Sequence, residues 1–202
     1  MDKVGIFIDG GYLQKILQKD FNSSAIDFSK FIHMLADKDP ILRAYYYNCM
    51  PYKSNPPTQE EAERFAKMQK FVDSLEMIDR FQVRLGKLEY RGTSNNGQRI
   101  FQQKRVDILL GCDLVLLSAK QKIGKAIIVT GDSDFIPAIE IAKNEGVEIE
   151  LVFSPQTLPH TSLIKIADVR HKLSQEEIDS IKFVTVNARF YVYPPKKKSD
   201  IL

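Results

Sequence analysis

The sequence predicts an α/β protein with a mainly parallel central sheet. Short apolar runs rich in β-branched residues alternate with stretches whose apolar residues recur at helical spacing. Two of the apolar runs end in aspartate: VGIFID at residues 4–9 and AIIVTGD at residues 126–132. Because an acid at the end of a buried strand is costly without a partner, these two endings also indicate a functional site.

In the first half of the chain, strand patterns alternate with helix patterns that carry recognisable end signals. Asp27 stands directly before an apolar-periodic stretch and is a candidate N-cap. Thr58 and Glu61 have the spacing of a capping box at the start of the next helix. The elements expected here are a strand at 4–9, helices at 11–20 and 27–37, a strand at 42–48, a helix at 59–78 and a strand at 80–86.

The second half begins with a hairpin and then resumes the alternation. The turn signal TSNNG separates two strand-like segments, so residues 87–104 should project from the body as a hairpin. Pro137 suits the first turn of a helix, and Gly146 suits its C-terminal end. The elements expected after the hairpin are a buried helix at 106–122, a strand at 125–131, a helix at 133–146, a strand at 147–153, helices at 162–173 and from Ser174, and a strand or strand pair within 182–193.

Size and composition indicate one globular domain with a short extension. The chain has 202 residues, of which 44% are hydrophobic and 27% charged, as is typical of a protein that buries a full core. We therefore assign residues 1–173 to one domain and residues 174–202 to a C-terminal extension with a basic tail. No apolar stretch approaches the roughly 18–20 residues that span a bilayer, so no membrane partner is expected.

The two cysteines favour a cytoplasmic location. Cys49 and Cys112 lie in apolar or aromatic segments without the spacing of metal ligands, so we interpret them as reduced thiols in the core. The net charge of +3 is too small to identify a partner, and nothing in the sequence decides between a monomer and a homo-oligomer.

Three aspartates from separate segments are predicted to meet at one edge of the sheet. Right-handed crossovers that start in the middle give the order 3-2-1-4-5 for the five parallel strands, and a crevice then opens at the carboxyl ends of strands one and four. Asp9 ends the first of these strands, and Asp132 follows the other. Asp107 starts the helix before the fourth strand, and that helix begins over the carboxyl ends because it runs antiparallel to the strand.

A carboxylate cluster of this kind indicates a hard metal ion and phosphodiester hydrolysis. Like charges that are brought together repel each other unless a proton or a cation joins them. Oxygen ligands alone favour Mg²⁺ or Mn²⁺ over zinc, and such an ion polarises a phosphoryl oxygen and lowers the pKa of a bound water. None of His33, His160 and His171 is placed to act as a base, and we interpret all three as incidental.

Two further aspartates have both a structural and a functional interpretation. Asp134 is a candidate N-cap for the helix at 135–144 and also a candidate metal ligand. Asp113 lies six residues after Asp107, which places it about 120° away around a helix. Asp113 would therefore reach the ion through a water molecule, or it would stabilise a neighbouring loop instead.

Basic and hydroxyl-bearing side chains around these acids are candidates for substrate binding. Lys104 precedes Asp107 by three residues and would either neutralise a substrate phosphate or pair with Asp107. Ser133 offers a hydroxyl and a backbone N–H at a helix start, where anions are favoured. The segments 80–92 and 98–105 mix Arg and Lys with aromatics, which suits nucleic acid but also suits a solvated strand pair. Further candidate substrate contacts are Arg91, Arg105 and Tyr12.

Three motifs follow one another along the chain: IFIDGGYL, KRVDILLGCDLV and IIVTGDSDF. In this order and spacing they resemble the NYN domains, the LabA-like branch of the PIN-domain nuclease superfamily, over about residues 3–153 and into SLIKIADVRHKL. The resemblance implies a PIN-like fold, a three-layer α/β/α sandwich, together with a divalent metal ion and ribonuclease activity. By motif position it assigns the core acids to Asp9, Asp107 and Asp132, and further acids to Asp113 and Asp134.

The chain departs from the family pattern in two places. Family members often carry an asparagine shortly after the first acid, where this chain has Gly10, Gly11 and Tyr12, so an amide contact to the substrate is missing. Many PIN nucleases also carry a helical acid between the second and third strands. The acids available for that position are Glu60, Glu61 and Glu63.

We therefore predict a Mg²⁺- or Mn²⁺-dependent endoribonuclease that acts on single-stranded RNA. The alternative is a non-catalytic module that binds RNA or DNA in a regulatory role, which the resemblance to LabA-like proteins also allows. A phosphohydrolase for small phosphate esters is disfavoured, because the first strand ends in IDGGY and lacks the second acid of a D-x-D motif.

Overall fold

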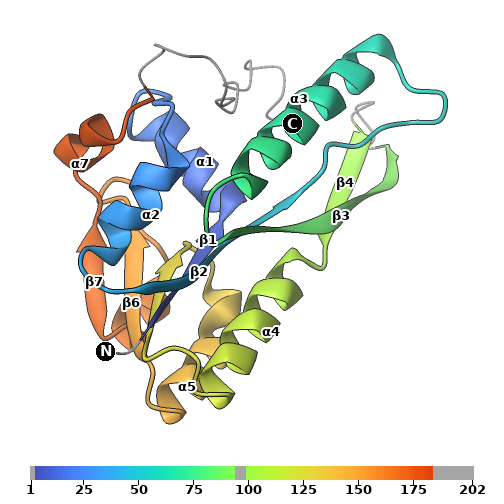
Figure 1. Ribbon diagram of the computed structural model, residues 1–202. Coiled ribbons are helices and arrows are strands. Elements are labelled where there is room, and N and C mark those ends of the chain that lie inside the picture. The colour runs from blue at the N-terminus through green and yellow to red at the C-terminus, as the bar shows by residue number, and fades with distance from the viewer. Residues whose placement is uncertain (1–2, 94–98, 184–202) are drawn as a thin grey trace.

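The computed structural model describes residues 3–93 and 99–183, and these ranges form one seven-stranded sheet. The strands are β1 (Val4–Asp9), β2 (Ile41–Cys49), β3 (Phe81–Thr93), β4 (Arg99–Lys104), β5 (Lys125–Val129), β6 (Glu148–Phe153) and β7 (Val169–Lys172). Their order is β4-β3-β2-β1-β5-β6-β7, and β4 runs antiparallel to β3 while the other neighbouring pairs are parallel (Figure 1). The five central parallel strands therefore confirm the predicted order 3-2-1-4-5.

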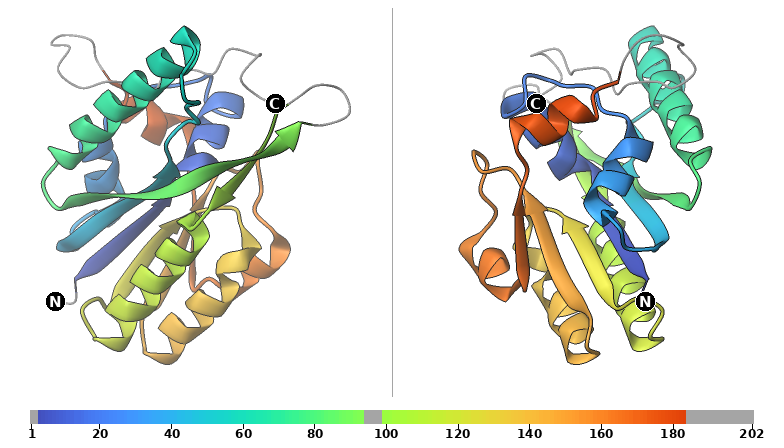
Figure 2. Two further views of the ribbon diagram at one scale, coloured as in Figure 1. Left: turned by 90° about the vertical axis from the view of Figure 1, so that its right-hand side faces the viewer. Right: turned by 60° about the vertical axis from the view of Figure 1, so that its left-hand side comes forward.

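Helices cover both faces of the sheet and confirm the predicted α/β class. They are α1 (Gly10–Lys19), α2 (Phe28–Ala36), α3 (Gln59–Glu76), α4 (Val106–Ala119), the short 3₁₀ helix η1 (Ser133–Phe135), α5 (Ile136–Asn144), α6 (Thr161–Ile166) and α7 (Gln175–Ser180). One face of the sheet is covered by α1, α2 and α3, and the other by α4 and α5 (Figure 1). The molecule is thus a three-layer sandwich, which the rotated views also show (Figure 2).

Local end signals explain where several helices begin and end. The Asp27 carboxylate accepts the backbone N–H three residues on, at 3.1 Å, and so caps α2. Thr58 and Glu61 form both hydrogen bonds of a capping box at the start of α3. Pro137 lies in the first turn of α5, and Gly146 follows that helix with a φ of +84°, which glycine adopts without strain. All of these signals were predicted from the sequence.

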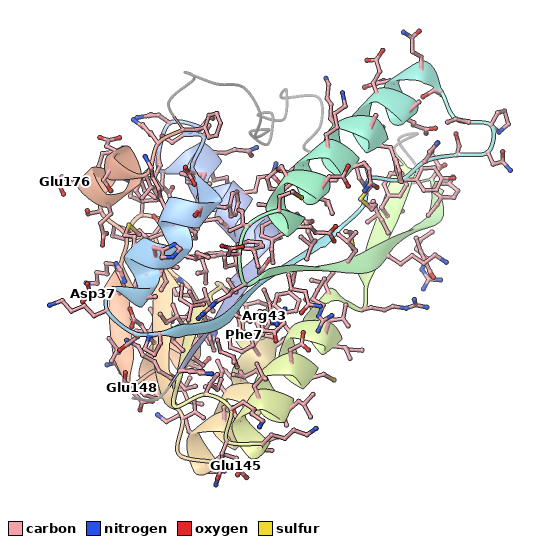
Figure 3. The ribbon with its side chains drawn as sticks, in the orientation of Figure 1. Phe7, Asp37, Arg43, Glu145, Glu148 and Glu176 are labelled. Atoms are coloured by element: carbon pink, nitrogen blue, oxygen red, sulfur yellow. The ribbon has the colours of Figure 1, made fainter. Side chains whose placement is uncertain are left out.

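The central strand β1 is buried on both faces and organises the core. Phe7, in the middle of the sheet (Figure 3), stacks on Tyr45 of β2 with ring centroids 5.6 Å apart. On the opposite face Tyr46 meets Phe28 of α2 and Phe71 of α3 edge to face, with centroids 5.6 and 5.7 Å away. Full burial of one such side chain stabilises the fold by about 1.5–3 kcal/mol. Successive tyrosines of β2 point to opposite faces of the sheet, so aromatic rings pack on both sides of it.

The helix α4 is buried on one side, whereas its apolar sequence predicted burial all round. Its outer side carries Ile108, which is 70% exposed, and Leu116, which is 50% exposed. Cys112 lies on the same side and is exposed, so the prediction of a core thiol is wrong for it, and Cys49 is half-buried. A helix in an outer layer buries one side only, because no described element packs outside it.

The segment predicted as one helix at 162–173 instead forms a short helix and an edge strand. After α6, the strand β7 pairs in parallel with β6. Asp168 fixes this change: its carboxylate accepts the Ile149 N–H at 2.9 Å and lies 2.6 Å from Lys143 Nζ. Contacts with β6 and α5 thus outweigh the helical pattern of the segment.

The predicted hairpin is confirmed and forms an arm. β3 is 13 residues long, and β4 returns along its second half in antiparallel pairing with a register shift between Tyr90 and Gly92. Figure 2 shows these two strands continuing past the rest of the sheet. We call residues 87–104 the arm.

Two predicted features lie outside the described residues. These are the hairpin turn at 94–98 and, within 184–202, the basic tail and most of the strand expected at 182–193. The helix expected from Ser174 is present as α7. Within the described ranges, no helix is both long and apolar enough to cross a membrane.

Candidate functional site

The carboxyl edge of the sheet brings together three segments that carry predicted acids. β1 and β5 are parallel neighbours with Ile8 opposite Val129, so Asp9 and Thr130 come next at the two strand ends. Helix α4 begins after β4 and runs back along the sheet from this edge (Figure 1). The topology therefore places the ends of two strands and the start of one helix side by side.

Asp9 is held by hydrogen bonds to both of its oxygens. Its Oδ1 accepts the backbone N–H groups of Gly11 and Tyr12 at 2.9 and 3.1 Å, which caps α1. Its Oδ2 accepts the Thr130 hydroxyl at 3.1 Å. Burial raises the pKa of Asp9, these hydrogen bonds oppose that shift, and the charge of Asp107 adds to it. The carboxylate is thus fixed in an environment that disfavours its negative charge.

Asp107 lies in the first turn of α4 and is coupled electrostatically to the other two segments. Its pKa is raised by desolvation first, and then by the negative charges of Asp132 and Asp134. Asp107 in turn raises the pKa of Asp9. Asp107 therefore repels acids at the ends of both strands, and a bound cation would relieve this repulsion.

Asp132 caps the turn after β5, and the prediction that Asp134 caps the following helix is wrong. The Asp132 Oδ1 accepts the Asp134 N–H at 3.0 Å and so caps η1, whereas α5 begins at Ile136 with Phe135 as its N-cap residue and has no side-chain cap. The Thr130 hydroxyl accepts the Asp132 N–H at 3.2 Å while it donates to Asp9. Thr130 thus links the two strand ends. Sequence reasoning missed it, although a polar residue directly after the run AIIV was an available signal.

Tyr12 braces the turn that carries Asp132. A Cβ atom added to Gly131 would lie 2.5 Å from Tyr12 Cε2, so the ring lies directly against the glycine. The hydroxyl donates to the Thr157 carbonyl at 3.2 Å and accepts the Ser154 N–H at 3.4 Å, and burial raises its pKa to about 12. These contacts give Tyr12 a structural role, and its predicted contact with substrate stays a prediction.

Asp113, a candidate metal ligand, is engaged by other partners. Arg84 donates to it through Nε at 3.0 Å and Nη2 at 3.3 Å, and the Tyr47 hydroxyl donates to it at 3.0 Å. Asp9, Tyr47 and Arg84 are register neighbours on β1, β2 and β3, so these contacts continue a row of polar side chains that starts at Asp9. The ion pair joins α4 to the sheet, and a metal role for Asp113 stays a prediction.

Asp113→Ala is expected to destabilise the fold and to leave catalytic activity largely intact. The Asp113 side chain is 17% exposed, and its loss removes the acceptor that Arg84 and Tyr47 share. Hydrogen bonds to a charged group contribute about 1.5–3 kcal/mol, but Arg84 is partly exposed, so the expected loss is about 1–3 kcal/mol. Urea unfolding measures this loss, and Asp107→Asn at an exposed acid should not lower stability. An Asp113→Ala variant that kept its stability but lost activity would point to a ligand instead.

The predicted substrate contacts are spread from the acids to the arm. Ser133 begins η1 and is half-buried, whereas Arg105 precedes α4 with a φ of +77° and is exposed. Arg91 lies on the arm, where its Nη2 is 3.5 Å from Glu89 Oε2. The side chain of Lys104 lies outside the described part of the structure.

Glu61, one of the acids available for the helical position of PIN nucleases, closes a loop. It is buried at the start of α3, and its carboxylate accepts the N–H groups of Ser54 and Thr58, each at 3.1 Å. Glu60 and Glu63 are exposed. Glu61 is therefore explained by the capping box and the loop that precedes it.

The donor set at the carboxyl edge fits a hard divalent cation in its chemistry. The coupled groups are all carboxylates, which are the ligands that Mg²⁺ and Mn²⁺ prefer. Among residues 3–93 and 99–183, no three acidic, histidine or cysteine side chains already converge on a point that could hold an ion. Asp9 is fixed, whereas Asp107 and Asp132 are exposed and are the ligands that can adjust.

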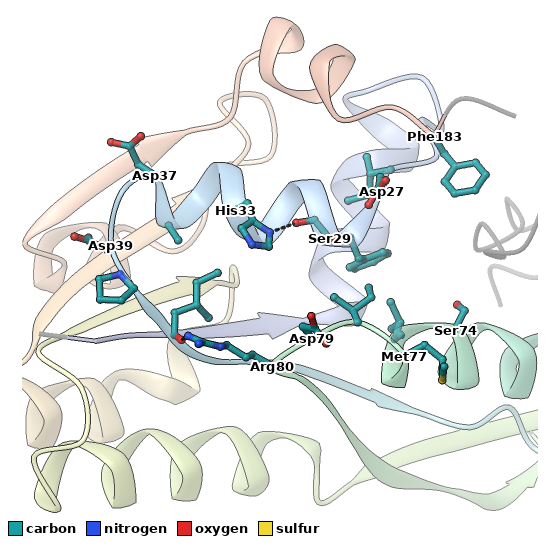
Figure 4. Close-up of a pocket in the computed structure, with 17 residues that line it drawn as sticks. Asp27, Ser29, His33, Asp37, Asp39, Ser74, Met77, Asp79, Arg80 and Phe183 are labelled. Carbon is teal, nitrogen blue, oxygen red and sulfur yellow. Dashed lines mark hydrogen bonds between the residues drawn. The ribbon is translucent and has the colours of Figure 1, made fainter. Parts of the chain in front are cut away.

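A cavity of about 730 Å³ lies on the opposite face of the sheet, between α2 and the end of α3 (Figure 4). Its lining includes Phe28, Met77 and Arg80 and contains none of the predicted site residues. His33 also lines it, with Nδ1 2.7 Å from the Ser29 carbonyl oxygen. Because the lining residues lie toward the amino ends of β2 and β3, this cavity is separate from the carboxylates.

Comparison with known families identifies the fold. The NYN domain family matches residues 3–174. The chain belongs to the NYN domain family. This is a PIN-like nuclease family whose members are typically ribonucleases and usually use divalent metal ions. Membership of the NYN family therefore implies a nucleic-acid substrate.

Two individual proteins are similar to this NYN domain. The uncharacterized protein y4oD of Sinorhizobium fredii (strain NBRC 101917 / NGR234) is 35% identical over 75 residues, which are 37% of this chain and 31% of that protein. The chain thus spans less than a third of that relative. The crystal structure of VPA0982, a protein of unknown function from Vibrio parahaemolyticus RIMD 2210633, has a TM-score of 0.57 at 17% identity over 87% of this chain and 94% of that one. The latter likeness concerns the fold alone.

Proposed function

We propose that this NYN domain is a metal-dependent ribonuclease that hydrolyses phosphodiester bonds in single-stranded RNA. The observation that carries the proposal is the electrostatic coupling of acids from three segments at the carboxyl edge. This coupling contributes to the raised pKa values of Asp9 and Asp107. Shifted pKa values of this kind concentrate at functional sites. Membership of the NYN family supports the same conclusion.

Asp9, Asp107 and Asp132 would hold a Mg²⁺ or Mn²⁺ ion, and Asp134 is a further candidate ligand. When bound, the ion supplies a polarised phosphoryl oxygen and a water of lowered pKa. Asp9 contributes a carboxylate whose orientation is already set by three hydrogen bonds. A preorganised ligand needs little rearrangement as charge develops in the transition state.

Ser133 and Arg105 are proposed to bind substrate phosphates beside the acids. Ser133 brings a hydroxyl directly after Asp132, and Arg105 brings an exposed cation two residues before Asp107. Donors and cations at these positions lower the cost of bringing a polyanion close to carboxylates. We assign Lys104 and Arg91 to the same role along the arm.

Asp132→Asn is expected to lower the rate of RNA cleavage at least about 100-fold, because it removes a carboxylate ligand of the ion. The fold should persist, since the amide oxygen can still accept the Asp134 N–H that caps η1. Initial rates on a labelled, unstructured RNA, measured with Mg²⁺, Mn²⁺ or EDTA, test this result. Asp37→Asn is the matched control, because Asp37 is exposed and lies beside the cavity on the far face.

The outcomes of this assay separate the rival functions. Metal-dependent cleavage at the wild-type rate by Asp132→Asn would exclude that residue from the site. RNA binding by the wild-type protein without cleavage, in millimolar Mg²⁺ and Mn²⁺, would favour the non-catalytic regulatory module instead.

A further inference from the structure

Three aromatic rings gather on the arm, outside the core. Tyr52, from the loop after β2, packs on Phe101 of β4 and Tyr90 of β3, with ring centroids 5.1 and 6.0 Å away. Tyr90 and Phe101 are cross-strand partners with centroids 5.9 Å apart. We call Tyr52, Tyr90 and Phe101 the aromatic cluster.

The aromatic cluster presents ring surface to solvent. Tyr90 is 44% exposed, although tyrosine rings of folded proteins usually bury most of their surface. The Tyr90 hydroxyl shares a hydrogen bond of 2.7 Å with Thr93 Oγ1, and its two neighbouring rings limit its movement further. A ring that is already held in place loses little conformational entropy when a flat partner stacks on it, so the cluster is preorganised for stacking.

Cations lie on the arm and in the loop that carries Tyr52. Lys87 and Arg91 alternate with Tyr90 along β3 and so project from the opposite face of that strand, where Lys87 Nζ and Arg91 Nη2 lie 3.6 and 3.5 Å from the Glu89 carboxylate. Lys53, next to Tyr52 in the chain, is an exposed cation whose Nζ lies over the Phe65 ring of α3, 5.1 Å from its centroid. Exposed aromatic surface among cations complements the bases and phosphates of nucleic acid, whereas an apolar protein partner would gain nothing from the charge.

The arm leads to the carboxyl edge on one face of the sheet. Side chains alternate along β3, so Tyr90 shares the face of Arg84, and the register row of Arg84 includes Asp9. At the other strand of the arm, Phe101 precedes Asp107 by six residues, a span of at most about 20 Å. A single strand that contacts the aromatic cluster is therefore close to the acids.

We propose that the aromatic cluster is a stacking site for unpaired bases of single-stranded RNA, which it aligns with the carboxyl edge. This inference rests on the proposed ribonuclease function and adds a second contact, remote from the scissile phosphate. Every base has a π face, so stacking tolerates any sequence. A duplex hides its base faces, so the arm selects RNA by the absence of pairing.

A purely structural role of the cluster predicts a different response to substitution. If the rings only tied the loop after β2 to the arm, an aliphatic side chain at Tyr90 would serve nearly as well as a ring. Stacking of a base needs a flat π surface, which leucine lacks and phenylalanine retains. Tyr90→Leu and Tyr90→Phe therefore separate the two roles.

The test measures binding of a fluorescein-labelled, unstructured RNA by anisotropy, in EDTA so that no cleavage occurs. Loss of one stacked base corresponds to roughly 5- to 150-fold weaker binding, so Tyr90→Leu should bind at least about fivefold more weakly. Tyr90→Phe should bind as the wild-type protein does. So should Met77→Ala, which alters an exposed side chain at the end of α3, away from the arm.

A 2-aminopurine base in the same RNA gives a readout that needs no variant. Its fluorescence is quenched by stacking, so the wild-type protein should quench it and a fully paired duplex should bind more weakly. Absence of quenching would overturn the proposal. Equal affinity of Tyr90→Leu and the wild-type protein, or of duplex and single strand, would overturn it as well.

The proposed stacking site and the proposed ribonuclease function can be tested independently of each other. Bis(p-nitrophenyl) phosphate is too small to reach both the arm and the acids, so it reports on the carboxyl edge alone. Tyr90→Leu should hydrolyse it at the wild-type rate. A wild-type protein that hydrolyses neither this ester nor RNA would contradict the ribonuclease proposal, while the binding result would still decide the stacking site.

Discussion

Asp9→Asn is expected to abolish metal-dependent cleavage and to raise the stability of the metal-free protein. The Asp9 carboxylate carries a charge that burial disfavours and that Asp107 repels. The asparagine side chain keeps an acceptor for the two N–H groups that cap α1, but it removes the charge and with it a metal ligand. Because a metal contributes several kcal/mol of transition-state stabilisation, the rate should fall at least about 100-fold.

The gain in stability has a defined dependence on pH. Since the pKa of Asp9 is raised in the folded protein, the folded state holds this proton more tightly than the unfolded state does. The stability of the metal-free protein therefore falls as pH rises above the unfolded pKa of about 3.9, and the fall is complete above the folded pKa. Asp9→Asn removes this contribution, so the melting temperatures should differ most near neutral pH.

Metal binding should stabilise the wild-type protein but not Asp9→Asn. A ligand at 100 times its Kd stabilises a protein by about 2.7 kcal/mol. For a domain of this size that corresponds to a rise of roughly 5–10 °C in Tm. Thermal melts in EDTA and in Mg²⁺ should show this rise for the wild-type protein and not for Asp9→Asn. A variant with the wild-type shift, or with wild-type cleavage, would contradict Asp9 as a ligand.

Gly131→Ala is expected to destabilise the fold and to impair cleavage together. The added Cβ would lie 2.5 and 2.8 Å from Cε2 and Cδ2 of Tyr12. The ring cannot easily yield, because its hydroxyl is held by Thr157 and Ser154. Overpacking at such a position costs about 1–3 kcal/mol. The strain falls on the turn that carries Asp132, so activity should fall as well.

Gly111→Ala is the matched control for this substitution. Its Cβ would lie 3.6 Å from the Ala138 Cβ, which is an ordinary contact, and the position is inside α4. Alanine there should be neutral or stabilising by up to about 1 kcal/mol. Urea unfolding and RNA cleavage of both variants measure the contrast. Wild-type stability of Gly131→Ala would show that the Tyr12 ring moves aside and does not brace the turn.

Much of the candidate site follows from local sequence patterns. Asp9 ends an apolar strand, Asp107 starts a helix and Asp132 follows another apolar strand, and each position can be inferred within a few residues. The rules for parallel sheets then bring these three ends to one edge. The structure confirms the strand order on which that inference depends.

The partners of individual side chains did not follow from such patterns. Asp113 was a candidate ligand because of its spacing from Asp107, but Arg84, far away in the chain, binds it. Thr130 was overlooked because its role depends on Asp9, which approaches it only when β1 and β5 pair. The apolar sequence of α4 likewise could not reveal that one side of the helix has no described layer outside it.

The sequence by itself determined the α/β class, the order of the central strands and the edge to which Asp9, Asp107 and Asp132 belong. Only the tertiary structure decided that Asp113 pairs with Arg84, that residues 169–172 form an edge strand, and that Tyr52 joins the arm. Strand and helix periodicity, end signals and crossover handedness act over short stretches of chain. Side-chain pairing and edge-strand addition join remote segments, and their free energies are similar to the local preferences with which they compete.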